Sequence, residues 1–359
     1  MKKILILTAG FGEGHNSAAR GVRDGLARAA PEATVELRDL FPETFGVFNE
    51  IVRRAYLGLI NRWPRCWRHV YDWLDRKNDF DKRFQRFRRL KQNLGNLLDQ
   101  FQPDAVVSTF PAYPYLVRQI LGQDRRCKNI AVVTDSITVN AIWYYAPSDY
   151  FIVANEQSAV VVRNGGIPNE KIKVFGFPVS PRFADFSKDR QSPSEAPPRV
   201  LYIINAGTRR APDLVRKFLR LEIQLTVTVG RDEKLRQAVE QAAAERNIQI
   251  YGWTGEMPRL LCENHILVGK AGGATVQETI AARCPMIVNH VVSGQEEGNA
   301  QLIVETNSGA IALSNDEVIA QVQRAFASGA RQWREWSDNI GQLSRPRASL
   351  DIAEFLMSI

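Results

Sequence analysis

Residues 268–282 read VGKAGGATVQETIAA and connect an apolar run to a helix-like segment. The run HILVG at 265–269 is typical of a buried strand, and the residues from about 274 to 283 are typical of a helix. Between them, Gly272 and Gly273 let a ligand approach the backbone closely. Because free N–H groups at the start of a helix attract anions, this junction favours a phosphate site. A plain tight turn would use the same glycines.

Polar side chains around this junction suit a ligand rich in hydroxyl groups. Glu278 lies one turn into the helix, where its carboxylate could accept hydrogen bonds from a ribose diol. The next strand is followed by NHVVSGQEEGNAQLI at 289–303. This loop offers the donors and acceptors that sugar hydroxyls require, on Gln295, Glu296 and Asn299. A solvated helix residue and an acid-rich helix start are the structural alternatives.

Outward from this point, apolar runs alternate with helix-like stretches in both halves of the chain, which predicts an α/β fold with two doubly wound parallel sheets. A Ser- and Pro-rich stretch at 180–198 is the expected linker, so the domains are 1–187 and 199–330. Residues 331–359 are expected to be helical and to pack back onto the first domain. Ligands of such sheets bind at the carboxyl ends of strands, so a site between two facing Rossmann-like domains is expected. The strands are predicted at 3–8, 34–37, 104–109, 129–134, 149–154, 199–205, 223–230, 248–252, 265–269 and 285–288.

A second glycine-rich junction occurs near the beginning, in LTAGFGEGHNSAARGV at 7–22. His15 is expected at or near the first turn of a helix, where the helix dipole lowers the pKa of an imidazole and keeps it neutral. A neutral imidazole can act as a general base. A purely structural histidine remains the alternative.

Composition limits the other possibilities. The 359 residues are 45% hydrophobic and 24% charged, which is ordinary for a globular protein. Four scattered cysteines without a CxxC pair and four scattered histidines suggest neither a disulfide framework nor a structural zinc site. No apolar run approaches the ~18 residues needed to span a bilayer, and the first residues lack the pattern of a signal peptide. A cytoplasmic protein is expected.

The net charge of +8 is concentrated in residues 48–91, which contain 13 Lys or Arg and 5 Asp or Glu. Tryptophan and phenylalanine alternate with these arginines, as at an anionic membrane surface. Amphipathic helices whose aromatic residues belong to the core would give a similar pattern. Single-stranded nucleic acid is the third interpretation, and nothing else in the chain supports it, so no nucleic-acid partner is expected.

Two stretches together resemble the monogalactosyldiacylglycerol synthase and processive diacylglycerol glucosyltransferase group of glycosyltransferase family 28. They are GFGEGHNSAA (10–19) and KAGGATVQETIAARCPMIVNHVVSGQEEGNA (270–300). FGFPVSPRF (175–183) and YGWTGEMPRLL (251–261) resemble further landmarks of the group, in the same order. The match extends over nearly the whole chain.

The resemblance implies a GT-B fold and an inverting transfer of a hexose from a UDP-sugar to a lipid hydroxyl, with diacylglycerol as the expected acceptor. The first domain would bind the acceptor and the inner face of the cell membrane, and the second the UDP-sugar. His15 would deprotonate the acceptor, Glu278 would hold the ribose, and Gln295 and Glu296 would hold the sugar. The backbone at Gly272, Gly273, Ala274 and Thr275 would bind the diphosphate, and the uracil would lie near Gly252, Trp253 and Met257.

The resemblance also implies that no metal or other cofactor is needed, which is consistent with backbone N–H groups stabilising the leaving diphosphate. The sequence Asp79–Phe80–Asp81 lies inside the basic aromatic segment rather than after a strand, which disfavours a metal site there. Asn140 stands where the group usually has a histidine. The alternatives are a UDP-sugar epimerase, a transferase of the same fold with a non-lipid acceptor, and a non-catalytic regulator that binds nucleotide sugars.

Overall fold

The computed structural model describes residues 1–46, 80–122, 126–135, 139–186, 192–194, 196–244, 246, 248–292 and 296–359. The described chain separates into two compact units. The first contains Met1–Pro181 together with Arg347–Ile359, and the second runs from Arg182 to Pro346 apart from the short stretch 293–295. Residues 47–79, most of the basic aromatic segment, lie outside the described residues.

The first unit is built on a six-stranded parallel sheet in the order β2-β1-β3-β4-β5-β6. Its strands are β1 (Lys3–Thr8), β2 (Thr34–Asp39), β3 (Ala105–Ser108), β4 (Lys128–Val132), β5 (Tyr150–Val153) and β6 (Ile172–Val174). Its helices are α1 (Glu13–Ala29), α4 (Phe80–Phe84), α5 (Arg88–Phe101), α6 (Ala112–Leu121), α7 (Ala141–Tyr144), α8 (Glu156–Asn164) and α15 (Ala348–Ser358).

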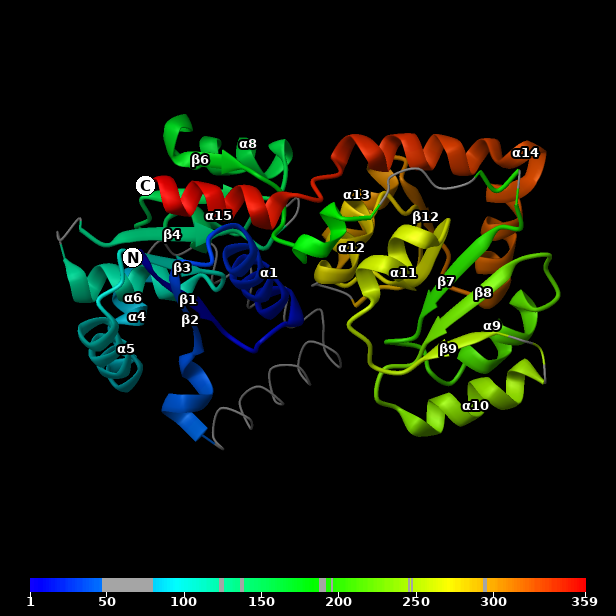
Figure 1. The fold of residues 1–359 in the computed structure, drawn as a ribbon, viewed down its shortest axis with the longest axis horizontal. Coiled ribbons are helices and arrows are strands. Elements are labelled where there is room, and N and C mark those ends of the chain that lie inside the picture. The colour runs from blue at the N-terminus through cyan, green and yellow to red at the C-terminus, as the bar shows by residue number, and fades with distance from the viewer. Residues whose placement is uncertain are drawn as a thin grey trace. The chain divides into compact units, whose positions relative to one another are not determined.

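The sequence of β1 explains why this sheet lies in the middle of the unit. Ile4 and Ile6 belong to one hydrophobic cluster and Leu5 and Leu7 to another, and all four are fully buried. A strand that buries both faces reads as a continuous apolar run, as KILILT does. Helices α1 and α15 pack together, and Figure 1 shows the red α15 alongside the blue α1. Residues from the two ends of the chain therefore share one core.

The second unit repeats the plan with the order β12-β11-β10-β7-β8-β9, again all parallel. Its strands are β7 (Arg199–Ile203), β8 (Gln224–Thr228), β9 (Gln249–Tyr251), β10 (Ile266–Lys270), β11 (Met286–His290) and β12 (Gly309–Ile311). Its helices are α9 (Ala211–Phe218), α10 (Glu233–Ala243), α11 (Met257–Glu263), α12 (Gly273–Ala281), α13 (Glu297–Glu305) and α14 (Asn315–Leu343).

The predicted α/β class with two parallel sheets is confirmed, and all ten predicted strands are present. Two strands were not predicted, β6 and β12. Each has three residues and lies at the edge of its sheet, where a long apolar run is not needed. The last stretch of the chain consists of two helices, because the helix that starts at Asn315 ends at Leu343 and α15 begins at Ala348.

Each sheet has one point where the order of strands reverses. In the first sheet β1 lies beside both β2 and β3, and in the second β7 lies beside both β8 and β10. The loops that leave neighbouring strands at such a point diverge and leave a crevice at their carboxyl ends, where ligands of open α/β sheets bind. In the first sheet the loops after β1 and β3 flank this point, and in the second sheet the loops after β7 and β10 flank it.

Candidate functional sites at the carboxyl ends of the two sheets

His15 lies at the strand-order reversal of the first sheet. Helix α1 begins at Glu13 after the loop that follows β1, so His15 is in its first turn. Its Nδ1 lies 2.7 Å from the carbonyl oxygen of Thr109, which directly follows β3. The hydroxyl of Thr134, just beyond β4, lies 3.0 Å from the same nitrogen. Three neighbouring strands thus converge on one imidazole.

These contacts determine which nitrogen carries the proton. A carbonyl oxygen only accepts, so Nδ1–H of His15 donates to Thr109, and Nε2 keeps its lone pair. Burial lowers the pKa of His15 from 6.5 to about 4, while the hydrogen bond to Thr109 acts weakly in the other direction. The rings of Phe110 and Trp143 lie 5.2 Å and 6.4 Å from the imidazole, centroid to centroid. The imidazole is therefore neutral, and two aromatic rings lie next to it.

A second titratable group, Asp135, follows the threonine that contacts this histidine. Asp135 follows Thr134 and accepts a hydrogen bond from the backbone N–H of Asn140 at 3.2 Å. Burial raises the pKa of its carboxyl from 3.8 to about 6, although the hydrogen bonds from Asn140 and from the Trp143 side chain favour the charged form. Asp135 accordingly changes charge close to neutral pH.

Asn140 caps a helix. Its side-chain oxygen accepts a hydrogen bond from the backbone N–H of Ile142 at 2.9 Å, which gives one N–H group in the first turn of α7 a partner. A residue of this kind holds α7 in place, and α7 carries the Trp143 ring next to His15.

The second unit places the glycine pair at its own strand-order reversal. Gly272 is the N-cap of α12 and has no side-chain cap, and Gly273, Ala274 and Thr275 form the first turn. The first N–H groups of a helix have no intrahelical partner. A Cβ added at Gly272 or Gly273 would meet no atom closer than 3.6 Å, so it would make only ordinary van der Waals contacts.

Two of the side chains that we predicted near these glycines lie beside them. Glu296 places Oε1 3.8 Å from the position that a Cβ of Gly272 would take, and Asn299 places its amide nitrogen 3.6 Å from the corresponding point of Gly273. Asn299 also donates to the carbonyl of Ala271 at 3.2 Å. The glycine loop and the start of α13 therefore form one polar cluster. Gln295 lies outside the described residues.

The remaining predicted residues lie on α12 and on the loop after β9. Glu278 is half-buried in the second turn of α12. Gly252 and Trp253 follow β9, and Trp253 is 71% exposed with the guanidinium of Arg231 over its ring at 5.1 Å. Met257 is the first residue of α11, a helix that packs beside α12. Gly252 and Trp253 follow β9, whereas the glycine pair follows β10. These two strands are three strand spacings apart, about 14 Å.

Sequence reasoning missed three residues at these sites: Thr109, Thr134 and Lys270. Thr109 acts through a backbone carbonyl, which leaves no side-chain signal. Lys270, at the end of β10, forms an ion pair with Glu296 at 2.6 Å. The position of Lys270 directly before the glycine loop was the signal that could have identified it.

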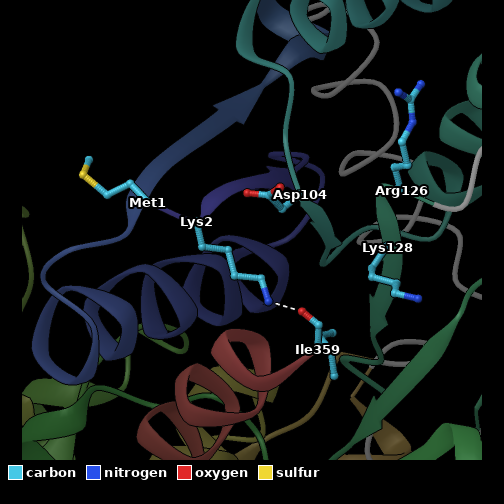
Figure 2. A pocket seen from close by; sticks show the side chains of 6 residues that line it. All are labelled: Met1, Lys2, Asp104, Arg126, Lys128 and Ile359. Carbon is cyan, nitrogen blue, oxygen red and sulfur yellow. Dashed lines mark hydrogen bonds between the residues drawn. The ribbon is translucent and has the colours of Figure 1, made fainter.

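A shallow depression elsewhere in the first unit does not belong to these sites. Figure 2 shows its lining side chains, and the side chain of Lys2 is hydrogen-bonded to the backbone oxygen of Ile359. Lys2 and Asp104 precede strands β1 and β3, so the depression lies at the amino ends of the strands. His15 lies at the carboxyl ends. The lining residues are Met1, Lys2, Asp104, Arg126, Lys128 and Ile359.

Within the described ranges, no three His, Cys, Asp or Glu side chains are grouped as metal ligands. In the same part of the chain, no helix combines the length and apolar character that crossing a bilayer requires.

Known proteins match this chain over nearly its whole length. The family model of monogalactosyldiacylglycerol (MGDG) synthase matches residues 15–179, and that of the glycosyltransferase family 28 C-terminal domain matches residues 202–336. The processive diacylglycerol beta-glucosyltransferase of Staphylococcus carnosus is 28% identical over 354 residues, which cover 93% of this chain and 88% of that protein.

Solved structures share the fold at much lower identity. The crystal structure of MurG from Acinetobacter baumannii matches with a TM-score of 0.63 and 14% identity over the full length of both chains. The UDP-GlcNAc 2-epimerase of Neisseria meningitidis, solved with UDP-GlcNAc bound, matches with a TM-score of 0.60 and 14% identity, also over both full chains. The two parallel sheets thus define a protein of the GT-B class.

Within that class, the two family models match in the order that the sequence motifs predicted. The chain belongs to the monogalactosyldiacylglycerol synthase and processive diacylglycerol glucosyltransferase group of glycosyltransferase family 28.

Proposed function

We propose that the protein is an inverting glycosyltransferase that transfers a hexose from a UDP-sugar to the free hydroxyl of diacylglycerol. The observation that carries this proposal is the match of both family models, with a neutral base in the first matched region and an open glycine loop in the second. The matched names include both galactose- and glucose-transferring enzymes, so a hexose is the proposed group.

In the proposed reaction, His15 is the general base. Its Nδ1–H is engaged by Thr109, so Nε2 accepts the proton of the acceptor hydroxyl as the oxygen attacks the anomeric carbon. The new C–O bond forms on the face opposite the bond that breaks, which inverts the configuration. The low pKa of His15 keeps the base unprotonated throughout the physiological pH range.

The leaving group is UDP, whose diphosphate gains negative charge as the sugar departs. The N–H groups of Gly273, Ala274 and Thr275 supply fixed dipoles for this charge, with no need for a metal ion. Glu296 and Asn299, beside the glycines, are proposed to bind the hexose together with Gln295.

The same proposal assigns the nucleoside to the elements next to α12. Glu278 would bind the ribose hydroxyls, and the uracil would lie at Gly252, Trp253 and Met257. The adjacency of α11 and α12 supports this assignment, because Met257 begins α11.

The acceptor is a lipid, so we propose that the protein works at the inner face of the cell membrane and is otherwise cytoplasmic. The described part of the basic segment divides between two roles. Phe80 is buried and Phe84 contacts Tyr115, as core residues do. Phe87 is 39% exposed and is flanked by the exposed Arg86 and Arg88, as a membrane-facing residue would be.

The direct test is transfer by the purified protein. It is incubated with vesicles that contain diacylglycerol and with UDP-glucose or UDP-galactose, and lipids are read by mass spectrometry. A hexosyl-diacylglycerol is expected with at least one donor. If UDP-GlcNAc is instead epimerised and no lipid product forms with any donor, the transferase proposal is wrong.

His15→Ala separates a transferase from a non-catalytic regulator. Loss of the base is expected to lower kcat by about 10²- to 10⁴-fold. Affinity for UDP, measured by calorimetry, is expected to stay within twofold, because His15 is in the first unit and the glycine loop is in the second. Equal turnover by the variant and the wild type would remove His15 from the mechanism.

A further inference from the structure

The glycine loop of the second unit ends a strand whose last side chain is a cation. Lys270 closes β10, and its Nζ lies 2.6 Å from Oε1 of Glu296. The Glu296 side chain is only 8% exposed, whereas that of Lys270 is 25% exposed. One partner is therefore fixed inside the protein, and the other still faces solvent.

The carboxylate that holds this ammonium is itself held. Oε2 of Glu296 accepts a hydrogen bond from the backbone N–H of Val292 at 2.9 Å. The two oxygens of Glu296 thus have different partners, one on the loop after β11 and one at the end of β10. Because the carboxylate has a fixed place, the lysine side chain is oriented by it.

The ion pair lies beside Gly272. A Cβ placed on Gly272 would be 3.7 Å from Cε of Lys270 and 3.8 Å from Oε1 of Glu296. A group that packs over Gly272 therefore comes within van der Waals distance of the lysine stem. An ammonium has three donors, so the pair with Glu296 leaves hydrogens for such a group.

A diphosphate that leaves from this loop would need more positive charge than the helix N-terminus provides. The N-terminus of α12 contributes about half a positive charge, whereas a departing nucleoside diphosphate gains a full negative charge. Arg210, on the loop after β7 at the same reversal point, donates to the carbonyls of Asn289 and Leu313 and so holds the fold. Lys270 is better placed to supply the missing charge.

We propose that Lys270 is a catalytic residue that stabilises the diphosphate of the leaving nucleotide, and that Glu296 positions its ammonium over the glycine loop. This inference rests on the proposed function, because it takes a UDP-sugar as the donor. It adds an ammonium donor, whose charge is shared with the Glu296 carboxylate, to the backbone dipoles.

The first experiment compares UDP with uridine. Lys270→Met is expected to weaken UDP binding by about 10- to 100-fold, the loss typical of one charge-assisted contact. Uridine has no phosphate, so its affinity is expected to stay within twofold. Lys217→Met is the matched control, since Lys217 pairs with Asp316 on the surface of the same unit. It is expected to change neither affinity. If Lys270→Met binds UDP as tightly as the wild type does, the inference is overturned.

The second experiment tests whether Lys270→Met weakens UDP binding only because the Glu296 carboxylate loses its positive partner. Glu296→Gln is compared with the double variant Lys270→Met/Glu296→Gln, and neither carries the carboxylate charge. The double variant is expected to bind UDP at least about tenfold more weakly. Equal UDP affinities would mean that Lys270 only neutralises Glu296. A wild-type protein that binds no UDP would instead refute the proposed function, so the two failures are distinguishable.

Discussion

Two side chains at one edge of the first sheet show how burial adjusts chemistry at the scale of a residue. Burial lowers the pKa of His15 to about 4 and raises that of Asp135 to about 6. Between about pH 4 and 6.5, the contribution of His15 to the free energy of unfolding rises with pH, because its imidazole is protonated in the unfolded state and neutral in the folded state. The contribution of Asp135 to the free energy of unfolding falls as the pH rises through about 6, because its carboxyl holds the proton more tightly in the folded state than in the unfolded state. Between pH 4 and 6 the two effects oppose each other.

Asp135→Asn tests this balance. The variant removes the cost of a buried charge and keeps an oxygen for the N–H of Asn140. We expect the free energy of unfolding to rise by about 1–3 kcal/mol at pH 7.5, with no gain at pH 4, where the wild-type carboxyl is already protonated. Urea unfolding at both pH values measures the difference. An equal gain at both would indicate a packing effect and not ionisation.

Thr134→Val tests the positioning of the base. The change removes the hydroxyl 3.0 Å from Nδ1 of His15 and leaves the Thr109 carbonyl as the oxygen that fixes the ring. We expect kcat to fall by about 3- to 10-fold while UDP affinity is unchanged, because a freer imidazole reaches the acceptor less often. Thr134→Ser, which restores the hydroxyl, is the control. Unchanged kcat in the valine variant would show that Thr109 alone suffices.

At this scale the sequence predicted candidate site residues but not the residues that contact them. The two glycine-rich junctions predicted His15 and the pair Gly272–Gly273 as candidates, because glycines before a helix are a local signal. The contacts of His15 are 94 and 119 positions away in the chain. They depend on which strands become neighbours, so no local pattern contains them.

At the scale of the element, the apolar runs predicted most of the strands, and two of the three-residue edge strands, β6 and β12, escaped prediction. β6 and β12 each have a single neighbour in their sheet, so three residues suffice for pairing. The composition also did not predict how closely helix α1 packs against other segments. In α1, Gly21 and Gly25 face backbone of other segments, and a Cβ at Gly25 would lie 2.2 Å from the carbonyl oxygen of Ser349.

Gly25→Ala is therefore expected to destabilise the protein. The added methyl cannot fit between α1 and the start of α15, so the helices must separate, at a cost of about 1–3 kcal/mol. Gly95→Ala in α5 is the matched control, since its nearest contact would be a methyl at 4.0 Å. It is expected to stabilise by about 1 kcal/mol through helix propensity. Thermal unfolding of both variants gives the comparison, and equal melting temperatures would contradict the close approach.

At the scale of the whole molecule, the uneven charge is the most informative feature of the composition. The segment 48–91 accounts for an excess of eight positive charges, and residues 80–91 are its described part. There, Arg86, Arg88 and Arg89 are exposed around Phe87. The count of charges predicted a surface for acidic partners. It did not predict which aromatic residues belong to the core, because that depends on neighbours such as Tyr115.

Replacing Arg86, Arg88 and Arg89 together by Gln is expected to weaken binding to phosphatidylserine vesicles by about 100-fold, at roughly 1 kcal/mol for each cation. Sedimentation of protein with vesicles at low salt measures this, and high salt should narrow the difference. A control variant replaces the exposed Arg324, Arg331 and Arg334 of α14, which changes the net charge equally. If both variants lose the same affinity, the binding follows net charge and not this surface.

The contact between α1 and α15 also has a consequence for how the protein is made. Ile352, Ala353 and Leu356 of α15 complete the hydrophobic cluster that contains Val22 and Leu26 of α1. The ribosome reaches them only after the intervening strands and helices of the second sheet. At ordinary elongation rates that interval is roughly ten to thirty seconds. During it, the nascent first unit presents an unfinished apolar face to solvent.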